Sequence, residues 1–166
     1  MRHQAIILKK VPLKEDDELI MCYTRDFGKQ RYRAKSSTLA HSKQGTHLDV
    51  LNHIEFSLVE GKHSPIIASA ASIATFPRIK SSLPGLSAAY VLLECFEKLV
   101  YEDQEDHKLW SVLLDELSRL EGGAVDPGGM QTRLLSVMGH HASLHVQELA
   151  QSRFISLQFL RTMIKS

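Results

Sequence analysis

The segment from Phe27 to Leu48 contains five lysines and arginines and no aspartate or glutamate. Four of these cations occupy every second position of a short run and the fifth follows in the next stretch of chain: Lys29, Arg31, Arg33, Lys35 and Lys43. Alternate side chains of a β-strand project to the same face, so the first four would form a row with a spacing of about 6.6 Å. Such a row can follow a phosphate backbone, whereas cations without anions between them repel one another. We predict that these five residues bind nucleic acid; the alternative is a strand face that is charged because it is solvated.

The aromatic residues near this row indicate how a nucleic acid would be held. Tyr23, Phe27 and Tyr32 are close to it in sequence, but Tyr23 and Tyr32 fall in the apolar positions of their strands. Aromatic side chains at such positions belong more often to a hydrophobic core than to a base-stacking surface. We therefore expect binding to depend on phosphates more than on bases.

Two other groups of side chains are of types that can bind a metal ion. The carboxylates of Glu15–Glu18 would suit Mg²⁺ in phosphoryl chemistry, but consecutive residues seldom converge on one ion, and turns between strands are commonly acidic. His140, His141 and His145 are the other candidates, and His141 and His145 would share a helix face only if the helix continued past Gly139, which we expect to end it. We predict no metal site and no cofactor.

Sequence motifs of common enzymes are missing. There is no GxSxG, Walker-type phosphate loop, GxGxxG or HExxH, so no catalytic constellation is visible. Cys22 and Cys95 have no partner at C-x2-C spacing, which excludes a four-cysteine zinc module and a disulfide scaffold and fits a reducing compartment. The longest stretch without charge or histidine, Ser64–Pro77, is shorter than the roughly 18 residues of a membrane span, and no secretory signal is present. We predict a cytoplasmic protein that is not an enzyme.

Charge and hydrophobic pattern divide the chain into two parts. Residues 1–80 carry a net charge of +5 and residues 81–166 a net charge of −4, so the first part is the one expected to meet a polyanion. Five apolar or alternating runs, separated by turn residues, fill the first part: Gln4–Val11, Glu18–Thr24, Gln30–Ser36, Asp49–Val59 and a run from Pro65 to near Pro77. Five short strands in about 75 residues predict a small closed or nearly closed β-barrel.

The second part has the periodicity of helices. Leu86–Tyr101 is apolar on nearly every side, which is typical of a helix buried against several partners. Three more helices are expected from caps and apolar spacing: one ending at Gly122-Gly123 after the acidic run Glu102–Asp106, one starting at Asp126-Pro127, and one starting near Ser156. The predicted class is α+β, with a barrel domain at residues 1–80 and a helical domain at residues 81–166.

Several short motifs follow one another along the chain in an order that matches a known protein family. They are Ala5-Ile6-Ile7-Leu8, Glu15 and Asp17 before Leu19, the run TRDFGK at Thr24–Lys29, Ala34-Lys35, the run IEFSLVEG at Ile54–Gly61, Phe76-Pro77, and the helix with Ala88-Ala89-Tyr90 and Leu92-Leu93-Glu94. Together they cover roughly residues 4–120, and their order resembles the RecO family of bacterial recombination mediators.

The resemblance implies an N-terminal five-stranded OB-fold barrel followed by a helical domain. It also implies binding of single- and double-stranded DNA, annealing of complementary strands, and work with a RecR-like protein to load recombinase on SSB-coated DNA. By position, the basic strand and the loop with Lys43 correspond to the family's DNA-binding face.

The sequence departs from the family pattern in several places. The family usually has a glycine where Ser36 stands and a Pro-Phe pair near Val50-Leu51. Many members also carry a cysteine zinc module after a helix that resembles Leu134–Gly139, and this module is missing here. The chain instead continues through His140–Arg153 into Phe154–Leu157, which resembles the family's last helix. The sequence therefore predicts a shortened, zinc-free member, and its acidic helical half disfavours a contact with the acidic SSB tail.

Three functional hypotheses follow. The leading one is a non-enzymatic, DNA-binding recombination mediator of DNA repair. The alternative is an adaptor whose helical half docks a protein partner and whose barrel binds little DNA. A metal-dependent nuclease is the third, and cleavage that requires Mg²⁺ would distinguish it.

Overall fold

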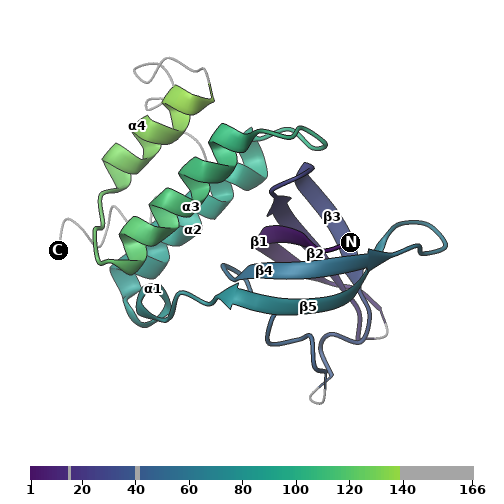
Figure 1. Cartoon of the computed structure of the whole chain (residues 1–166). Coiled ribbons are helices and arrows are strands. Elements are labelled where there is room, and N and C mark those ends of the chain that lie inside the picture. The colour runs from purple at the N-terminus through teal and green to yellow at the C-terminus, as the bar shows by residue number, and fades with distance from the viewer. Residues whose placement is uncertain (15, 40–41, 139–166) are drawn as a thin grey trace. The chain divides into compact units, whose positions relative to one another are not determined.

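A computed structural model of the chain describes residues 1–14, 16–39 and 42–138 (Figure 1). Three features expected from the sequence lie outside these residues: Glu15 at the start of the acidic run, the histidines at 140, 141 and 145, and the helix near Ser156. Contacts divide the chain into two compact units. The first unit combines Met1–Thr75 with Leu99–Asp106, and the second combines Phe76–Lys98 with the described residues from 107 to 138.

The first unit is a closed barrel of five strands (Figure 1). The strands are β1 (His3–Pro12), β2 (Glu18–Thr24), β3 (Gly28–Ala34), β4 (His53–Val59) and β5 (Ile66–Ala74). They pair around the barrel in the order β1-β2-β3-β5-β4, with β4 returning to β1. Every pairing is antiparallel except the one between β3 and β5. This is the OB-fold arrangement, and the predicted barrel is confirmed.

Alternation along β2 and β3 separates the inside of the barrel from the outside. Ile20 lies opposite Tyr32, and Met21 lies opposite Arg31. Ile20 and Tyr32 belong to the hydrophobic core of the barrel. Because neighbouring residues of a strand point to opposite faces, Met21 and Arg31 point away from the inside of the barrel, and Met21 is buried there while Arg31 is exposed. The same alternation fixes the facing of every charged residue of β3.

The turn between β2 and β3 depends on Gly28. Its φ of +67° lies in the left-handed region that favours glycine. A Cβ atom at this position would lie only 1.9 Å from the carbonyl oxygen of Gln104. The hydroxyl of Thr24 closes the turn, since it accepts the Phe27 N–H at 3.0 Å and donates to the Gly28 carbonyl at 2.9 Å. The turn expected at this place is confirmed, and residue 104 packs directly on it.

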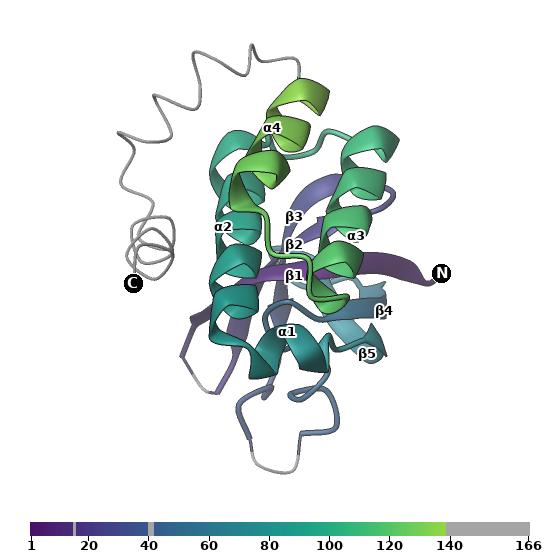
Figure 2. The same cartoon turned by 90° about the vertical axis from the view of Figure 1, so that its left-hand side faces the viewer.

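The second unit is helical. Its elements are α1 (Pro77–Ser81), α2 (Leu83–Leu99), α3 (His107–Glu121) and α4 (Pro127–Val137). Figure 2 shows α2 and α3 side by side, with α4 in front of them and between the two. Nine residues of α2 are buried, on nearly all of its sides, as its composition predicts. The sequence did not predict α1, because a five-residue helix starting at a proline resembles the end of a strand run.

Polar contacts fix the ends and the interior of this helical unit. Asp126 caps α4 as predicted, accepting the N–H of Gly129 at 3.0 Å. The carboxylate of Glu121 accepts the first N–H groups of α1, from Arg78 and Ile79. Glu116 is buried on α3 and forms a two-pronged ion pair with Arg133 of α4. Among the described helices, none is both long and apolar enough to cross a membrane.

Candidate nucleic-acid interface

Lys29, Arg31 and Arg33 point outward from β3, and Lys35 directly follows the strand. We call these four residues the basic row. Tyr32 and Ala34, between them, belong to the barrel core, so the predicted separation of the two faces of β3 is correct. Exposure differs along the row: Lys29 is buried at 7% exposed, the Arg31 and Arg33 side chains are 53% and 40% exposed, and Lys35 is exposed.

Lys43 lies in the connection between β3 and β4 and is exposed. Its neighbour Gln44 donates from Nε2 to the carbonyl of Ala68 at 2.6 Å. Ala68 belongs to β5, which lies next to β3 in the barrel. The fold thus places this connection on the strand adjacent to the basic row, although Lys43 is not part of the row itself.

The basic row has acidic partners that its own segment of sequence lacks. Arg31 forms an ion pair with Glu102. Arg33 donates to Asp17 from Nε at 2.6 Å and from Nη2 at 2.5 Å. The absence of acids between residues 27 and 48 led us to expect uncompensated cations. Tertiary folding corrects this expectation, because it brings carboxylates from two distant segments to the middle of the row.

Asp17 organises the end of β3 where Lys35 follows. Its carboxylate, 6% exposed, accepts the backbone N–H of Ser36 at 2.7 Å in addition to the two bonds from Arg33. The Ser36 hydrogen bond and the Arg33 guanidinium lower the pKa of Asp17, against the opposing effect of burial. Ser36 has a φ of +48°, the conformation that glycine adopts most easily. The family's usual glycine at this position therefore has a backbone explanation.

The described carboxylates of the acidic run each have their own partners. Asp16 accepts from the Thr38 hydroxyl at 3.2 Å, Asp17 from Arg33, and Glu18 from the Ser37 hydroxyl at 2.7 Å. Within residues 1–14, 16–39 and 42–138, no group of three or more histidine, cysteine or acidic side chains is placed to hold a metal ion. Asp16, Asp17 and Glu18 thus anchor the segment that follows β3.

The three aromatic residues near the row occupy different environments. Tyr32 packs in the core with its ring centroid 5.5 Å from that of Phe56. Tyr23 is also fully buried, but on the outer face opposite Lys29, and its hydroxyl donates to the Asp106 carbonyl at 3.4 Å. Burial is the main cause that raises the pKa of both tyrosines. The expectation that Tyr23 and Tyr32 are buried is confirmed, whereas Phe27 remains 43% exposed.

A pocket of about 440 Å³ opens beside Phe27. Phe27, Gln30 and Tyr32 line it, together with three acidic residues, Asp26, Asp103 and Glu105. Three acids disfavour a phosphate group at this place. The pocket is therefore less suited to a phosphate than the basic row, none of whose four residues lines it.

Comparison with known proteins identifies the family. Residues 1–76 match the family model described as recombination protein O, N terminal, and proteins called DNA repair protein RecO align over most of the chain. The chain belongs to the RecO family. The resemblance recognised in the sequence motifs is thereby confirmed.

Three RecO relatives illustrate the extent of the match. The protein of Roseiflexus sp. (strain RS-1) is 28% identical over 147 residues, covering 87% of this chain and 52% of the relative. That of Synechococcus sp. (strain JA-2-3B'a(2-13)) is 33% identical over 132 residues, covering 74% and 46%. That of Nocardioides sp. (strain ATCC BAA-499 / JS614) is 28% identical over 148 residues, covering 86% and 61%. This RecO-family chain spans about half the length of the first two relatives.

Sequence reasoning missed one part of this surface in the RecO-family chain. Residues 102–106 were treated only as an acidic run before a helix, yet they belong to the barrel unit and contact β3. A signal was present, because four acids in five positions complement the basic row in charge. Charge complementarity alone does not tell which of several basic segments an acidic run will meet.

Proposed function

We propose that the barrel unit binds nucleic acid through the phosphate backbone, and that the chain acts in DNA repair and recombination as a non-enzymatic mediator. In this proposal it binds single- and double-stranded DNA and anneals complementary strands. It also assists recombinase loading on SSB-coated DNA together with a RecR-like protein. Membership of the RecO family supports the general role, and the RecO relatives carry the name DNA repair protein.

The observation that carries the proposal is the outer face of β3. Arg31 and Arg33 project from it with half-exposed guanidinium groups, and Lys35 continues the row in solvent. OB-folds bind oligonucleotides on the face that contains strands 2 and 3. The cations thus lie on the strand that this fold most often uses for nucleic acid. An arginine fork can hold a phosphate with two hydrogen bonds, and a lysine supplies a point charge beside it.

The mechanism is neutralisation of charge. Each phosphate that pairs with a lysine or arginine releases condensed counterions, and this release supplies much of the binding free energy. Two DNA strands repel each other, so a cationic surface that holds both lowers the cost of bringing them together. Phosphates carry no direct sequence information, which suits a protein that must anneal any complementary pair.

The adaptor alternative has one observation in its favour. A pocket of about 370 Å³ lies between α3 and α4, with Val112 and Val137 among its lining residues and the charged groups of Asp115 and Arg119 beside them. Such a mixed apolar and charged pocket can receive a side chain of a protein partner. In that case the barrel would contribute little affinity for DNA.

Binding of labelled oligonucleotides at several salt concentrations tests the proposal. Fluorescence anisotropy with single- and double-stranded DNA should give affinities that fall linearly, on logarithmic axes, as salt rises. Annealing of complementary strands should be lost over the same salt range. Weak binding without salt dependence would favour the adaptor, and cleavage that needs Mg²⁺ would favour the nuclease.

A further inference from the structure

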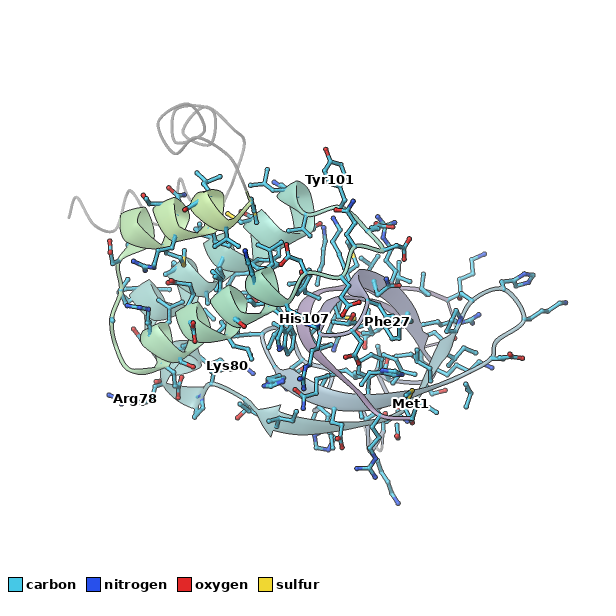
Figure 3. The ribbon with its side chains drawn as sticks, turned by 45° about the horizontal axis from the view of Figure 1, so that its top comes forward. Met1, Phe27, Arg78, Lys80, Tyr101 and His107 are labelled. Carbon is cyan, nitrogen blue, oxygen red and sulfur yellow. The ribbon has the colours of Figure 1, made fainter. Side chains whose placement is uncertain are left out.

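The acidic segment, residues 102–106, lies beside the first residues of β3. It belongs to the connection between α2 and α3, yet Leu99–Asp106 forms part of the barrel unit. Figure 3 labels Tyr101 and His107 at the two ends of the segment and Phe27 on the barrel. Within it, Glu102, Asp103, Glu105 and Asp106 are acidic.

Both backbone and side chains hold the segment in place. Glu102 forms a parallel β-bridge with Lys29, and the N–H of Asp103 donates to the Lys29 carbonyl at 3.3 Å. The amide of Gln30 donates to the Asp103 carboxylate at 2.8 Å. The carbonyl of Gln104 packs directly on Gly28. The acidic segment therefore extends the barrel surface next to the Lys29–Arg31 end of the basic row.

The charged part of this contact resembles a protein–phosphate contact. Glu102 pairs with Arg31 and presents an oxygen anion where a phosphate oxygen would otherwise bind. Both side chains are about half exposed, at 42% for Glu102 and 53% for Arg31. Exposed ion pairs contribute little to stability and weaken as salt screens them. Another anion can therefore replace Glu102 without unfolding the barrel.

We propose that the acidic segment is an intramolecular competitor of nucleic acid for the basic row. In the free chain it occupies the Lys29–Arg31 end and leaves the end at Lys35 accessible, where the neighbouring Arg33 is paired with Asp17. DNA binds first at the accessible end, then replaces Glu102 at Arg31 and displaces the segment. This inference rests on the proposed function, because it describes how the same site is regulated.

Competition reduces the apparent affinity for DNA: the intrinsic affinity is multiplied by the fraction of molecules in which the segment is displaced. It also changes the response to salt. Salt weakens the Arg31–Glu102 pair as well as the DNA contacts, so part of the loss of DNA affinity is offset. Without the competitor, the plot of log affinity against log salt should be steeper, by up to about 0.7 for one freed cation on single-stranded DNA.

The test uses the whole chain with Glu102→Gln and Asp103→Asn combined. Both replacements keep the size of the side chain, and asparagine tolerates the positive φ of +58° at position 103. The matched control is Glu60→Gln with Asp115→Asn, two exposed acids on the β4–β5 connection and on α3. The probe is an oligothymidylate of roughly 16 nucleotides, the upper end of the site size of one OB-fold.

We expect the first variant to bind about fivefold more tightly than the control at low salt, with the steeper salt dependence. Adding Arg31→Ala should remove this advantage, because Glu102 acts through Arg31. Equal affinity and equal slope in the variant and the control would overturn the inference. If neither the wild-type chain nor any variant binds with salt dependence, the proposed function fails instead.

Hydrogen exchange of the Asp103 amide gives a second readout that does not depend on affinity. This N–H donates to the Lys29 carbonyl in the free chain. Displacement of the acidic segment breaks the bond, so saturating oligothymidylate should accelerate exchange of the Asp103 amide. Unchanged or slower exchange on DNA binding would overturn the inference even if affinities differ.

Discussion

The structure determines which cations can be removed to test DNA binding without disturbing the fold. Lys29 is nearly buried, and Arg33 holds the buried carboxylate of Asp17, so replacing either one risks unfolding. Arg31, Lys35 and Lys43 are exposed. The informative variant is therefore Arg31→Gln, Lys35→Gln and Lys43→Gln combined.

The expected magnitude follows from two phosphate contacts, at Lys35 and Lys43, because in the competition proposed above DNA only takes the place of Glu102 at Arg31. Each contact on single-stranded DNA contributes about 0.7 to the slope of log affinity against log salt, so the slope should become shallower by roughly 1.4 units. At about 0.1 M salt this corresponds to roughly 25-fold weaker binding, relative to the affinity extrapolated to 1 M. Replacing all five predicted residues would suggest a larger change, but part of it would reflect damage to the fold.

Fluorescence anisotropy measured from low to moderate salt gives both the affinity for DNA and the slope of log affinity against log salt. A control with Arg78→Gln, Lys98→Gln and Arg119→Gln removes the same charge from exposed positions of the helical unit. Circular dichroism must show that both triple variants are folded. If the barrel variant loses no more slope than the control, DNA does not bind along β3, and the argument from the basic row is refuted.

Four further predictions test the surroundings of the site. The folded chain lowers the pKa of Asp17, so ionised Asp17 stabilises the fold above the unfolded pKa of about 3.9, and this stability is lost as pH falls through the folded pKa. Asp17→Asn should therefore lower Tm at pH 7 and make Tm fall less on acidification. An unchanged dependence of Tm on pH would contradict this. Ser36→Gly should change the free energy of unfolding by less than about 1 kcal/mol, because relief of the left-handed φ offsets the added entropy of the unfolded chain, whereas Ser36→Val should cost at least about 1 kcal/mol in urea unfolding. EDTA should leave fold and DNA affinity unchanged, and a stoichiometric metal in elemental analysis would refute that prediction. A fragment of residues 1–80 should have a lower Tm than the whole chain, because it lacks Leu99–Asp106 of the barrel unit. A cooperative transition of the fragment at the Tm of the whole chain would show that the five strands fold stably without that segment.

Local patterns predicted most of the elements because those elements satisfy local rules. The five predicted strands and three of the predicted helices agree with the structure. Asp126 caps α4 as predicted, because its side chain accepts the N–H of Gly129. The short helix α1 was missed because its N–H groups are capped by Glu121, more than forty residues away in sequence. No local pattern encodes such a partner.

The candidate site was predictable only in part for the same reason. The alternation of β3 correctly placed its cations on the face opposite Tyr32 and Ala34. The pairing of Arg31 with Glu102, and of Arg33 with Asp17, depends on tertiary structure. The full burial of Tyr23 on the outer face is another example, because its position in the strand indicated the inside of the barrel.

The barrel unit is discontinuous in sequence, and this has a consequence for how the protein is made. A ribosome delivers all five strands before α2, and Leu99–Asp106 only afterwards. At about 5–20 residues per second, the strands are synthesised roughly two to six seconds before the last piece of their unit. During that interval Arg31 has no Glu102 beside it, while the nascent barrel is still tethered to an RNA-rich particle. The order of synthesis thus leaves the basic row most open to nucleic acid before the chain is complete.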